Sequence, residues 1–361
     1  MSNAQRGRIP SLDGLRALAV ASVFYGHLAG TVGAFPERIF RITGDLGNLG
    51  VRAFFVMSGF LITTLLLREK DRTGTISLRG FYSRRALRLL PVFYAFLLVA
   101  AILSRVRVLQ VPAWNFAPTA LFVTNLFDVD WNLGHFWSLA IEEQFYLVWP
   151  AFLLLAGARR AMRCSLFVFV VTPLLHVVAF KLGSEPWARF SLSINAISIG
   201  CVLAGLRPLL HKCSVYMRLL GSRLVWFVAV SVWLCNMWTG HFSYLLFAYS
   251  SLALAFIIDR VSTYPTGAAR VLNWRPIVFI GAISYSLYVW QQVFLDRYSQ
   301  LGICRFPLNL ILALGCGLAS YYAIEKPLIR WRQSLKAKKK QSVQAMQSGI
   351  QINPVPVADA I

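Results

Sequence analysis

Long apolar runs separated by short basic segments are the main pattern of the chain. Ten runs approach the length of about 20 residues that a helix needs to cross the hydrocarbon core of a bilayer. They are 12–33, 47–67, 89–109, 137–157, 164–182, 191–206, 223–239, 242–258, 277–296 and 306–324. A shorter apolar piece at 113–126 is broken by Pro112 and Pro118, and we expect a re-entrant or interfacial helix there. The pattern predicts an all-α, polytopic membrane protein with about ten transmembrane helices around a central cavity or channel.

Composition supports a membrane protein and charge gives its expected orientation. Of 361 residues, 57% are hydrophobic and 14% are charged, which is too little charge for a soluble domain of this size. If the N-terminus is cytoplasmic, 27 of the 36 Lys and Arg residues fall on the inner side, 8 on the outer side, and Arg52 within a run. This positive-inside bias predicts a multi-pass protein of the cell inner membrane with both termini cytoplasmic. It explains the net charge of +22 without a nucleic acid partner.

The ends of the chain and the cysteines allow three further predictions. The first run has no small-residue cleavage site, so we interpret it as a retained helix and not a signal peptide. We expect a transmembrane domain over 1–332 and a disordered cytoplasmic tail over 333–361, whose lysines rest on anionic membrane lipids. Six scattered cysteines show no ligand spacing, so we predict neither a disulfide framework nor a metal site.

Charged groups at membrane depth are costly and usually face the protein interior. Arg16 and His27 are eleven residues apart, or about three helical turns, which places them on one face about 16 Å apart. That face would line a passage through the bilayer. In the alternative, which stays open, Arg16 snorkels to the inner surface and His27 bonds a neighbouring helix.

The second run places Arg52 at a depth similar to His27 and Ser58 nearer the middle, where Gly59 favours close helix packing. A buried guanidinium needs a partner. Adjacent carboxylates in the fourth run, Glu142 and Glu143, offer one.

Glu142 and Glu143 lie in the outer half of the fourth run and point to different helix faces, so at most one of them meets His27 well. Tyr146 is four residues after Glu142 and shares its face. The alternative is an exposed carboxylate pair in the headgroup zone.

A basic cluster precedes the third run. Arg79, Arg84, Arg85 and Arg88 stand within ten residues. They fit a positive-inside anchor and equally a phosphate site, for which guanidinium groups are suited. The cluster alone does not separate these two possibilities.

Six stretches together resemble the acyltransferase-3 family of integral membrane O-acyltransferases, in the family's order and over about residues 10 to 331. They are "LDGLRALAVASVFYGH", "GNLGVRAFFVMSGFLITTLLLRE", "FYSRRALRLLPVFY", "FWSLAIEEQFYLVWP", "GAISYSLYVWQQ" and "YYAIEKPLIRW". The resemblance implies transfer of an acyl group, usually acetyl, from cytoplasmic acyl-CoA to a hydroxyl of an extracytoplasmic carbohydrate or glycoconjugate. The donor substrate is then acyl-CoA (acetyl-CoA), with no metal.

The resemblance also implies roles for individual residues. His27 matches the essential histidine, Arg16 its required companion, and Glu142 and Glu143 the family's SxxEEQFY segment, which makes these four the catalytic candidates. The candidate substrate-binding residues are Asp13, Arg52, Ser58, Arg84, Arg85, Arg88, Tyr146, Tyr285 and Gln291.

The chain departs from the family pattern in two ways. Many members carry a histidine where this chain has Gln291 and Gln292, and glutamine does not take up a proton near neutral pH, so a second histidine role is in doubt. We also find no match to the SGNH-type extracytoplasmic domain that some members append.

These residues suggest a division of labour. The phosphates of acyl-CoA lie near Arg84, Arg85 and Arg88, and the thioester reaches His27, whose imidazole suits a general base. Glu142, with Glu143 in reserve, orients the imidazole, and Arg52 stabilises the oxyanion. Direct transfer and an acyl-histidine intermediate are both compatible with the residues.

Two other classes of function stay open. A secondary transporter or flippase of an acylated or glycosylated substrate also has about ten spans and buried charges, although we find no internal repeat of the kind such proteins show. A noncatalytic scaffold gives no reason for Arg16, His27, Arg52 and a carboxylate to converge. The acceptor, the acyl chain and the oligomeric state do not follow from the sequence.

Overall fold

The structure is a computed structural model that describes residues 9–237, 243–264 and 267–347, and every regular element in these ranges is helical. The all-α prediction is therefore confirmed for the part described. The longer helices are α1 (Pro10–Leu28), α3 (Leu46–Thr73), α4 (Leu78–Arg105), α7 (Phe136–Lys181), α8 (Glu185–Leu210), α10 (Leu224–Met237), α11 (Ser243–Thr263), α15 (Leu308–Ser320) and α16 (Lys326–Gln347). The shorter ones are α2 (Glu37–Thr43), η2 (Ala113–Asn115), α5 (Phe116–Ala120), η3 (Thr124–Leu126), α6 (Trp131–Gly134), α9 (Ser214–Gly221), α12 (Ala268–Leu272), α13 (Arg275–Ala282), α14 (Ser284–Trp290), η4 (Gln291–Val293), η5 (Gly302–Cys304) and the π-helical η6 (Tyr321–Glu325).

Within the described residues, six helical segments are long and apolar enough to cross a membrane. They are Leu46–Thr73, Leu78–Arg105, Trp131–Lys181, Glu185–Leu210, Leu246–Thr263 and Leu308–Leu335. The pair α9 and α10, bent by 72°, is a seventh candidate. The chain is a multi-pass membrane protein, while the expected count of about ten is not confirmed.

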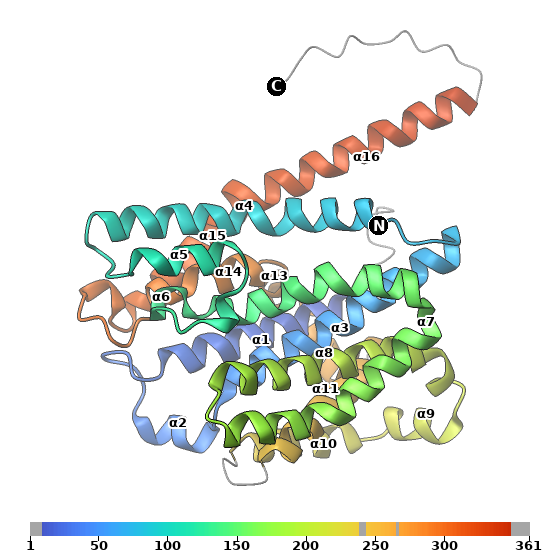
Figure 1. Ribbon diagram of the computed structural model, residues 1–361, viewed down its shortest axis with the longest axis horizontal. Helices are drawn as coiled ribbons and strands as arrows, with labels where there is room; N and C mark the ends of the chain where they lie inside the picture. Colours follow the sequence, from blue (N-terminus) through green and yellow to red (C-terminus); the bar gives the residue numbers. More distant parts are fainter. Residues whose placement is uncertain (1–8, 238–242, 265–266, 348–361) are drawn as a thin grey trace.

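One reason for the lower count is α7, which joins two of the expected runs, 137–157 and 164–182. Gly157 interrupts it with φ 79° and ψ 160°, a backbone conformation that only glycine adopts readily. The chain changes direction there (Figure 1). The segment Trp131–Lys181 has 51 residues, about 77 Å of helix, which is more than twice the thickness of the hydrocarbon core.

The other expected runs that are not counted are short or polar. The run 277–296 consists of α13, α14 and η4, each of eight residues or fewer. Helix α1 has 19 residues and is less apolar because it carries Asp13, Arg16 and His27. The piece 113–126 consists of η2, α5 and η3 instead of one continuous helix.

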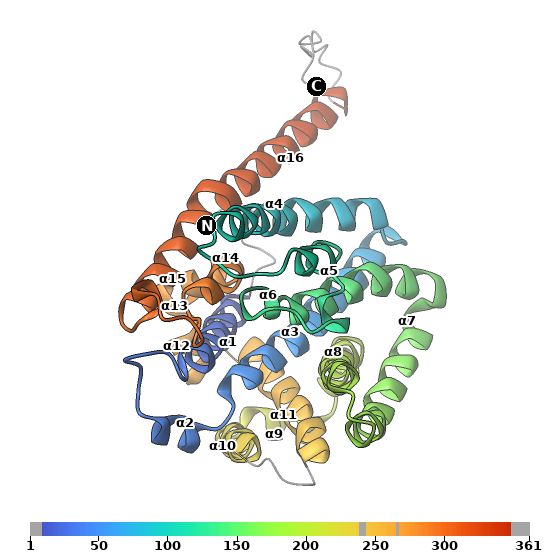
Figure 2. The same cartoon turned by 60° about the vertical axis from the view of Figure 1, so that its left-hand side comes forward.

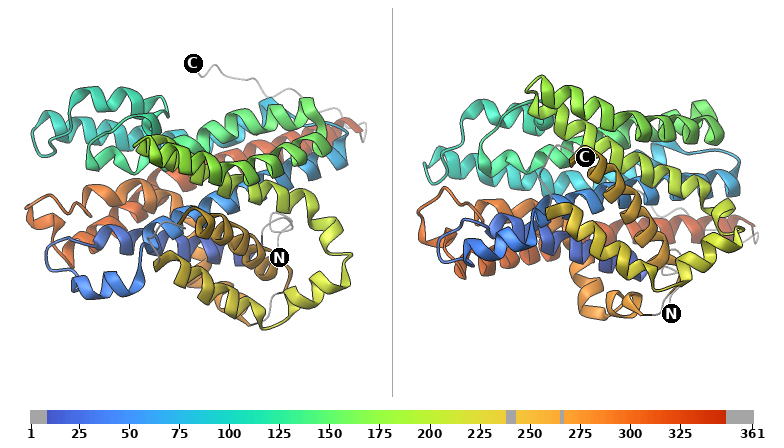
Figure 3. Two further views of the ribbon diagram at one scale, coloured as in Figure 1. Left: turned by 60° about the horizontal axis from the view of Figure 1, so that its bottom comes forward. Right: turned by 90° about the horizontal axis from the view of Figure 1, so that it is seen from below.

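Helices α3 and α8 cross in close contact, and small residues make the contact possible. A Cβ atom on Gly59 would lie 2.1 Å from the carbonyl oxygen of Ile197, and one on Gly200 would lie 2.2 Å from that of Val56. The packing role expected for Gly59 is thereby confirmed. Helix α1 packs against α3 and α13, and α10 packs against α11 on the side of the molecule seen in Figure 3.

Helix α16 projects from the bundle beside α4 (Figures 1 and 2). It extends to Gln347, so residues 333–347 differ from the irregular tail expected there. Lys, Gln, Ala and Met are good helix formers, and this segment is rich in them, which favours a helix. Residues 348–361 of the expected tail lie outside the described residues.

Candidate active site

Glu142 lies where α3, α4 and α7 meet. Its Oε1 accepts hydrogen bonds from the Ser58 and Tyr146 hydroxyls, and the Tyr146 hydroxyl also donates to Ser58 Oγ at 2.8 Å. Tyr146 is one helical turn after Glu142, so the shared face expected from the sequence brings these two side chains together.

Arg85 of α4 balances the carboxylates. Its Nη2 lies 3.7 Å from Glu142 Oε1 and its Nε lies 3.8 Å from Glu143 Oε1. The guanidinium carbon also lies 3.1 Å from the centre of the Tyr146 ring, a cation–π contact. One arginine therefore serves both members of the glutamate pair.

A small polar cavity of about 80 Å³ adjoins this cluster. Six of the predicted site residues line it: Arg16, Ser58, Arg85, Arg88, Glu142 and Tyr285. Three polar residues that the sequence analysis did not select also line it: Ser138, Ser284 and Tyr288. Asp13, another candidate, lies 3.7 Å from Arg16 through its carboxylate and is buried.

Glu325 is a buried carboxylate that the sequence analysis missed. It accepts a 2.8 Å hydrogen bond from Ser286 Oγ and interacts electrostatically with Arg88 and Arg16. The π-helical turn η6 places it there. A glutamate at the end of an apolar run, in "YYAIEKP", was the available signal.

His27 lies near the end of α1, in a second cluster. Its ring meets the Trp131 ring edge-on with centres 5.5 Å apart, and the Gln291 side chain lies beside it. Arg297 donates to the Gly26 carbonyl oxygen at 3.1 Å and lies over the Trp131 ring, with its guanidinium carbon 4.6 Å from the ring centre. Trp131 and Arg297 were not predicted as site residues.

Several buried polar atoms around His27 lack a hydrogen-bond partner of normal geometry within the described residues. They are His27 Nδ1, Trp131 Nε1 and both amide atoms of Gln291, whose side chain is fully buried. Gln291 is close enough to His27 to interact, but the geometry does not meet hydrogen-bond criteria. These atoms are therefore available to bond a polar group beside His27.

Helix α14 connects the two clusters. Tyr285, Tyr288 and Gln291 recur every three residues, which places them along one side of the helix and its 3₁₀ extension. The Tyr288 hydroxyl donates to the His135 carbonyl oxygen at 2.6 Å and lies 2.6 Å from Ser138 Oγ. His135 in turn interacts electrostatically with His27. Polar groups therefore continue from the cavity to His27.

The direct pairing expected between His27 and a glutamate is not formed. The electrostatic neighbours of the imidazole are Gln291, Arg297, Asp45 and His135. Both glutamates face Arg85 instead, because that arginine reaches them from α4.

Two arginines also lie elsewhere than expected. Arg52 is buried and stacks over the Phe247 ring of α11 at 4.2 Å, with Asp45 as its electrostatic partner, so its expected pairing with the glutamates is wrong. The ring face attracts the guanidinium charge, but it does not replace the hydrogen bonds that a carboxylate accepts, and Arg52 Nη1 has no hydrogen-bond partner within the described residues. Arg84 pairs with Glu69 at 3.4 Å and does not line the cavity.

These features define an integral membrane protein with a charged and polar interior site. More specifically, the chain belongs to the acyltransferase-3 family, because residues 9–325 match that family's acyltransferase domain. The resemblance found in the sequence motifs is thereby confirmed.

Curated relatives fit this assignment. The chain is 28% identical to O-acetyltransferase OatA of Staphylococcus aureus (strain NCTC 8325 / PS 47), over 89% of this chain and 57% of that protein. It is 30% identical to the putative peptidoglycan O-acetyltransferase YrhL of Bacillus subtilis (strain 168), over 89% and 55%. It is 28% identical to peptidoglycan O-acetyltransferase OatA of Listeria monocytogenes, over 90% and 56%. The chain spans a little more than half the length of these relatives, and no solved structure matches it.

Proposed function

We propose that the protein is a membrane O-acetyltransferase that moves an acetyl group from cytoplasmic acetyl-CoA to a hydroxyl of an extracytoplasmic carbohydrate. The observation that carries the proposal is the line of partly buried polar groups from Arg85 and Arg88 through Tyr288 to His27. Family membership and the names of the relatives support the reaction type.

The proposed orientation has both termini in the cytoplasm and the protein in the inner membrane. Ten crossings result if α7 supplies two of them, α9 and α10 one, and α13 and α14 together one, with α1 as the first. The basic segments then lie on the cytoplasmic side. In this orientation Arg88 is nearer the cytoplasm and His27 is nearer the outer surface, with the predicted central cavity between them.

The donor approaches from the arginine side. The phosphates of acetyl-CoA are held by Arg85 and Arg88, because guanidinium groups bind phosphate through paired hydrogen bonds. Arg16 lies beside the same cavity and interacts with Glu325. A space of about 80 Å³ accommodates a small acyl group, so entry of the longer pantetheine arm requires surrounding side chains to move.

His27 is the proposed general base. Its imidazole takes the proton of the acceptor hydroxyl, the hydroxyl oxygen attacks the thioester carbonyl, and the departing CoA sulfur receives a proton as the ester forms. We assign the positioning of the imidazole to Gln291 instead of Glu142, since Gln291 lies beside the ring. We also assign stabilisation of the oxyanion to Arg297 or to the Gln291 amide. Direct transfer needs no covalent intermediate, although the histidine is also suited to form one.

Peptidoglycan is the first acceptor to test. Two of the relatives carry it in their names. Its sugars present hydroxyl groups on the outer side of the membrane, which is the side on which His27 lies in the proposed orientation.

The test uses purified protein in lipid vesicles with labelled acetyl-CoA and peptidoglycan fragments. We expect His27→Ala to lower acetyl transfer by about 10²-fold or more, because general base catalysis contributes about 10²–10⁴-fold. His176→Ala is the control, since His176 is also buried but bonds to Ala188 and Ser191 between α7 and α8. Equal activity of the His27 variant and the wild type contradicts the proposal. Passage of substrate across the vesicle membrane without ester formation would support a transporter instead.

A further inference from the structure

A larger cavity of about 620 Å³ lies between α3, α7 and α8, and none of its lining residues lines the cavity beside Glu142. Its wall on α7 starts at Ala158, directly after the break at Gly157. Arg68 from the last turns of α3 and Arg207 from the last turn of α8 contribute the other sides. The volume lies in the range of about 300–1,000 Å³ that is typical of ligand sites.

Positive charge dominates the rim of this cavity. Four arginines line it, namely Arg68, Arg159, Arg163 and Arg207, against a single acidic residue, Asp71. In the part of the chain that the structure describes, the first three are exposed and no ion pair is recorded for them. An anion that enters the rim can therefore pair with these guanidinium groups without first breaking another ion pair.

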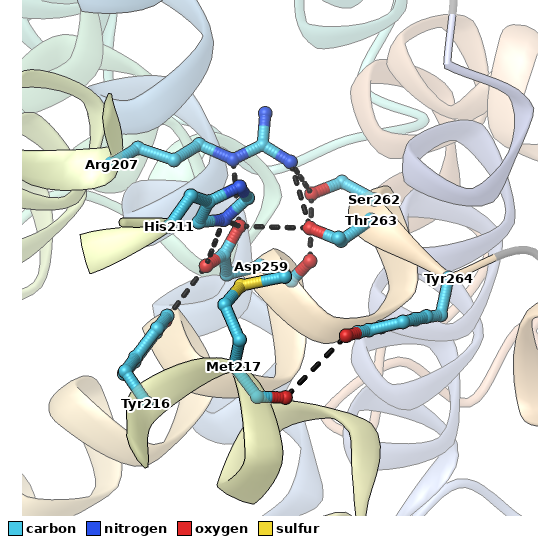
Figure 4. A network of polar contacts seen from close by, with 8 residues as sticks. All are labelled: Arg207, His211, Tyr216, Met217, Asp259, Ser262, Thr263 and Tyr264. Atoms are coloured by element: carbon cyan, nitrogen blue, oxygen red, sulfur yellow. Dashed lines mark hydrogen bonds and ion pairs between the residues drawn. The ribbon is translucent and has the colours of Figure 1, made fainter. Parts of the chain in front are cut away.

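Arg207 is held in place by a buried carboxylate (Figure 4). Asp259 of α11 is fully buried and its Oδ1 lies 2.7 Å from Arg207 Nε, while Arg207 Nη2 donates to Ser262 and Thr263 at 3.1 and 2.9 Å. His211 also bonds to the carboxylate, at 3.0 Å. The remaining nitrogen, Nη1, takes part in none of these bonds and points away from Asp259 in Figure 4.

The inner wall is apolar, and exposed leucines line part of the cavity. Leu67, Met162 and Val202 line the cavity, and Leu166 and Leu209 line it while remaining 47% and 64% exposed. Exposed leucines on spanning helices meet acyl chains. A ligand at this site thus has an apolar part that reaches it from the bilayer and an anionic part at the arginine rim.

We propose that this cavity binds an anionic phospholipid, with the phosphate on Arg68, Arg159, Arg163 and Arg207 and part of an acyl chain against the apolar wall. Basic pockets between spanning helices at the cytoplasmic surface are suited to such headgroups. The positive-inside distribution places these arginines at that surface. A soluble phosphate has the same anionic chemistry, but the exposed leucines at the mouth favour a ligand that comes from the membrane.

The test measures binding of phosphatidylglycerol and phosphatidylcholine to the full chain in detergent, by native mass spectrometry and by lipid-dependent thermal stabilisation. We expect phosphatidylglycerol to bind more tightly than phosphatidylcholine. The double variant R159Q/R163Q should weaken phosphatidylglycerol binding by roughly 25-fold, since each basic residue near an anionic lipid contributes a factor of about 5. Both arginines are exposed, so the double variant should fold. The matched control is R218Q/R223Q, which removes two exposed arginines of the same end outside the cavity and should leave binding unchanged.

A charge-neutral variant tests the apolar wall. Ala158→Phe fills the cavity without altering charge and should weaken phosphatidylglycerol binding at least fivefold. Equal binding of the two lipids, equal losses in the two arginine double variants, or full binding in Ala158→Phe overturns the proposal. Displacement of the lipid by adenosine 3′,5′-bisphosphate, together with a raised KM for acetyl-CoA in R159Q/R163Q, also overturns it, because the cavity then belongs to the soluble donor. None of these outcomes depends on the assignment of His27.

Discussion

The side chain of Glu142 illustrates how neighbours decide the role of a single residue. Its Oε1 accepts from Ser58 and Tyr146 and lies near Arg85. A carboxylate with three such neighbours is a good electrostatic anchor. The Glu142 carboxylate therefore holds Arg85 at the edge of the cavity.

The Tyr146 hydroxyl should contribute more to stability than an ordinary tyrosine hydroxyl does. Tyr146→Phe removes a hydrogen bond to a charged group, for which we expect a cost of about 1.5–3 kcal/mol. Tyr82→Phe is the control, since the Tyr82 hydroxyl donates to the neutral carbonyl of Leu147 at 2.7 Å and should cost about 0.5–1.5 kcal/mol. Unfolding of both variants in detergent measures the difference. Equal losses of unfolding free energy in the two variants would mean that the hydrogen bond to Glu142 stabilises the protein no more than a hydrogen bond to a neutral carbonyl.

Arg84 and Arg88 occupy the same basic segment but have different surroundings, which permits a matched comparison. Arg88 lines the cavity, whereas Arg84 pairs with Glu69 outside it. Arg88→Gln should raise the KM for acetyl-CoA by about tenfold or more, because a charge-assisted bond to phosphate is lost. Arg84→Gln should change it less than threefold. Initial rates at varied acetyl-CoA concentration measure both, and equal effects would contradict the assignment of the donor to the cavity.

Local spacing anticipated many of these residues, and tertiary contacts account for those it did not. Turn-by-turn periodicity was enough to associate Glu142 with Tyr146. It could not identify the partner of Arg52, because Phe247 is almost 200 positions away and the sequence offers many aromatic residues. Trp131 and Arg297 were missed for the same reason, since they approach His27 from segments distant in sequence.

Close contact of backbones governs the structure at the scale of helices. The crossing of α3 and α8 depends on Gly59 and Gly200, each of which faces a carbonyl oxygen of the other helix. A glycine also allows close packing of α1 against α13, where a Cβ atom on Gly281 would lie 1.7 Å from the Asp13 carbonyl oxygen. A glycine in a helix indicates that another segment packs closely against it, but it does not identify that segment. The sequence therefore predicted the packing role of Gly59, but it did not predict that α8 is the helix packed there.

Gly59→Ala should therefore separate α3 from α8. We expect a loss of about 1–3 kcal/mol in stability, the usual cost of overpacking, and reduced acetyl transfer because Ser58 is displaced together with its neighbour. Gly315→Ala in α15 is the control, since its Cβ atom would enter open space and alanine favours the helix. Thermal unfolding in detergent compares the two variants. A Gly59 variant as stable as the Gly315 variant would show that the crossing tolerates a wider spacing.

The whole molecule has two chemically different ends. Arg85, Arg88 and the arginine-rimmed cavity lie towards the ends of α3 and α8 that carry the basic segments, and His27 lies towards the end that carries α2 and α6 (Figure 1). Hydropathy and charge predicted this polarity because the membrane imposes both rules on every crossing. They also predicted that the chain reverses between the runs 137–157 and 164–182, which it does at Gly157. They did not predict the short helices α13 and α14, which depend on packing.

The proposed chemistry requires that the basic end face the cytoplasm, and cysteine accessibility tests this requirement directly. Cys213 is exposed between α8 and α9 at the basic end, and Gln300 is exposed in the segment between α14 and α15 at the opposite end. In a chain that keeps Cys213 as its only cysteine, a membrane-impermeant maleimide should react only after the cells are permeabilised. In an otherwise cysteine-free chain, Gln300→Cys should react in intact cells. The reverse pattern would place Arg85 and Arg88 outside, where no acetyl-CoA reaches them, and the proposed direction of transfer would then be wrong.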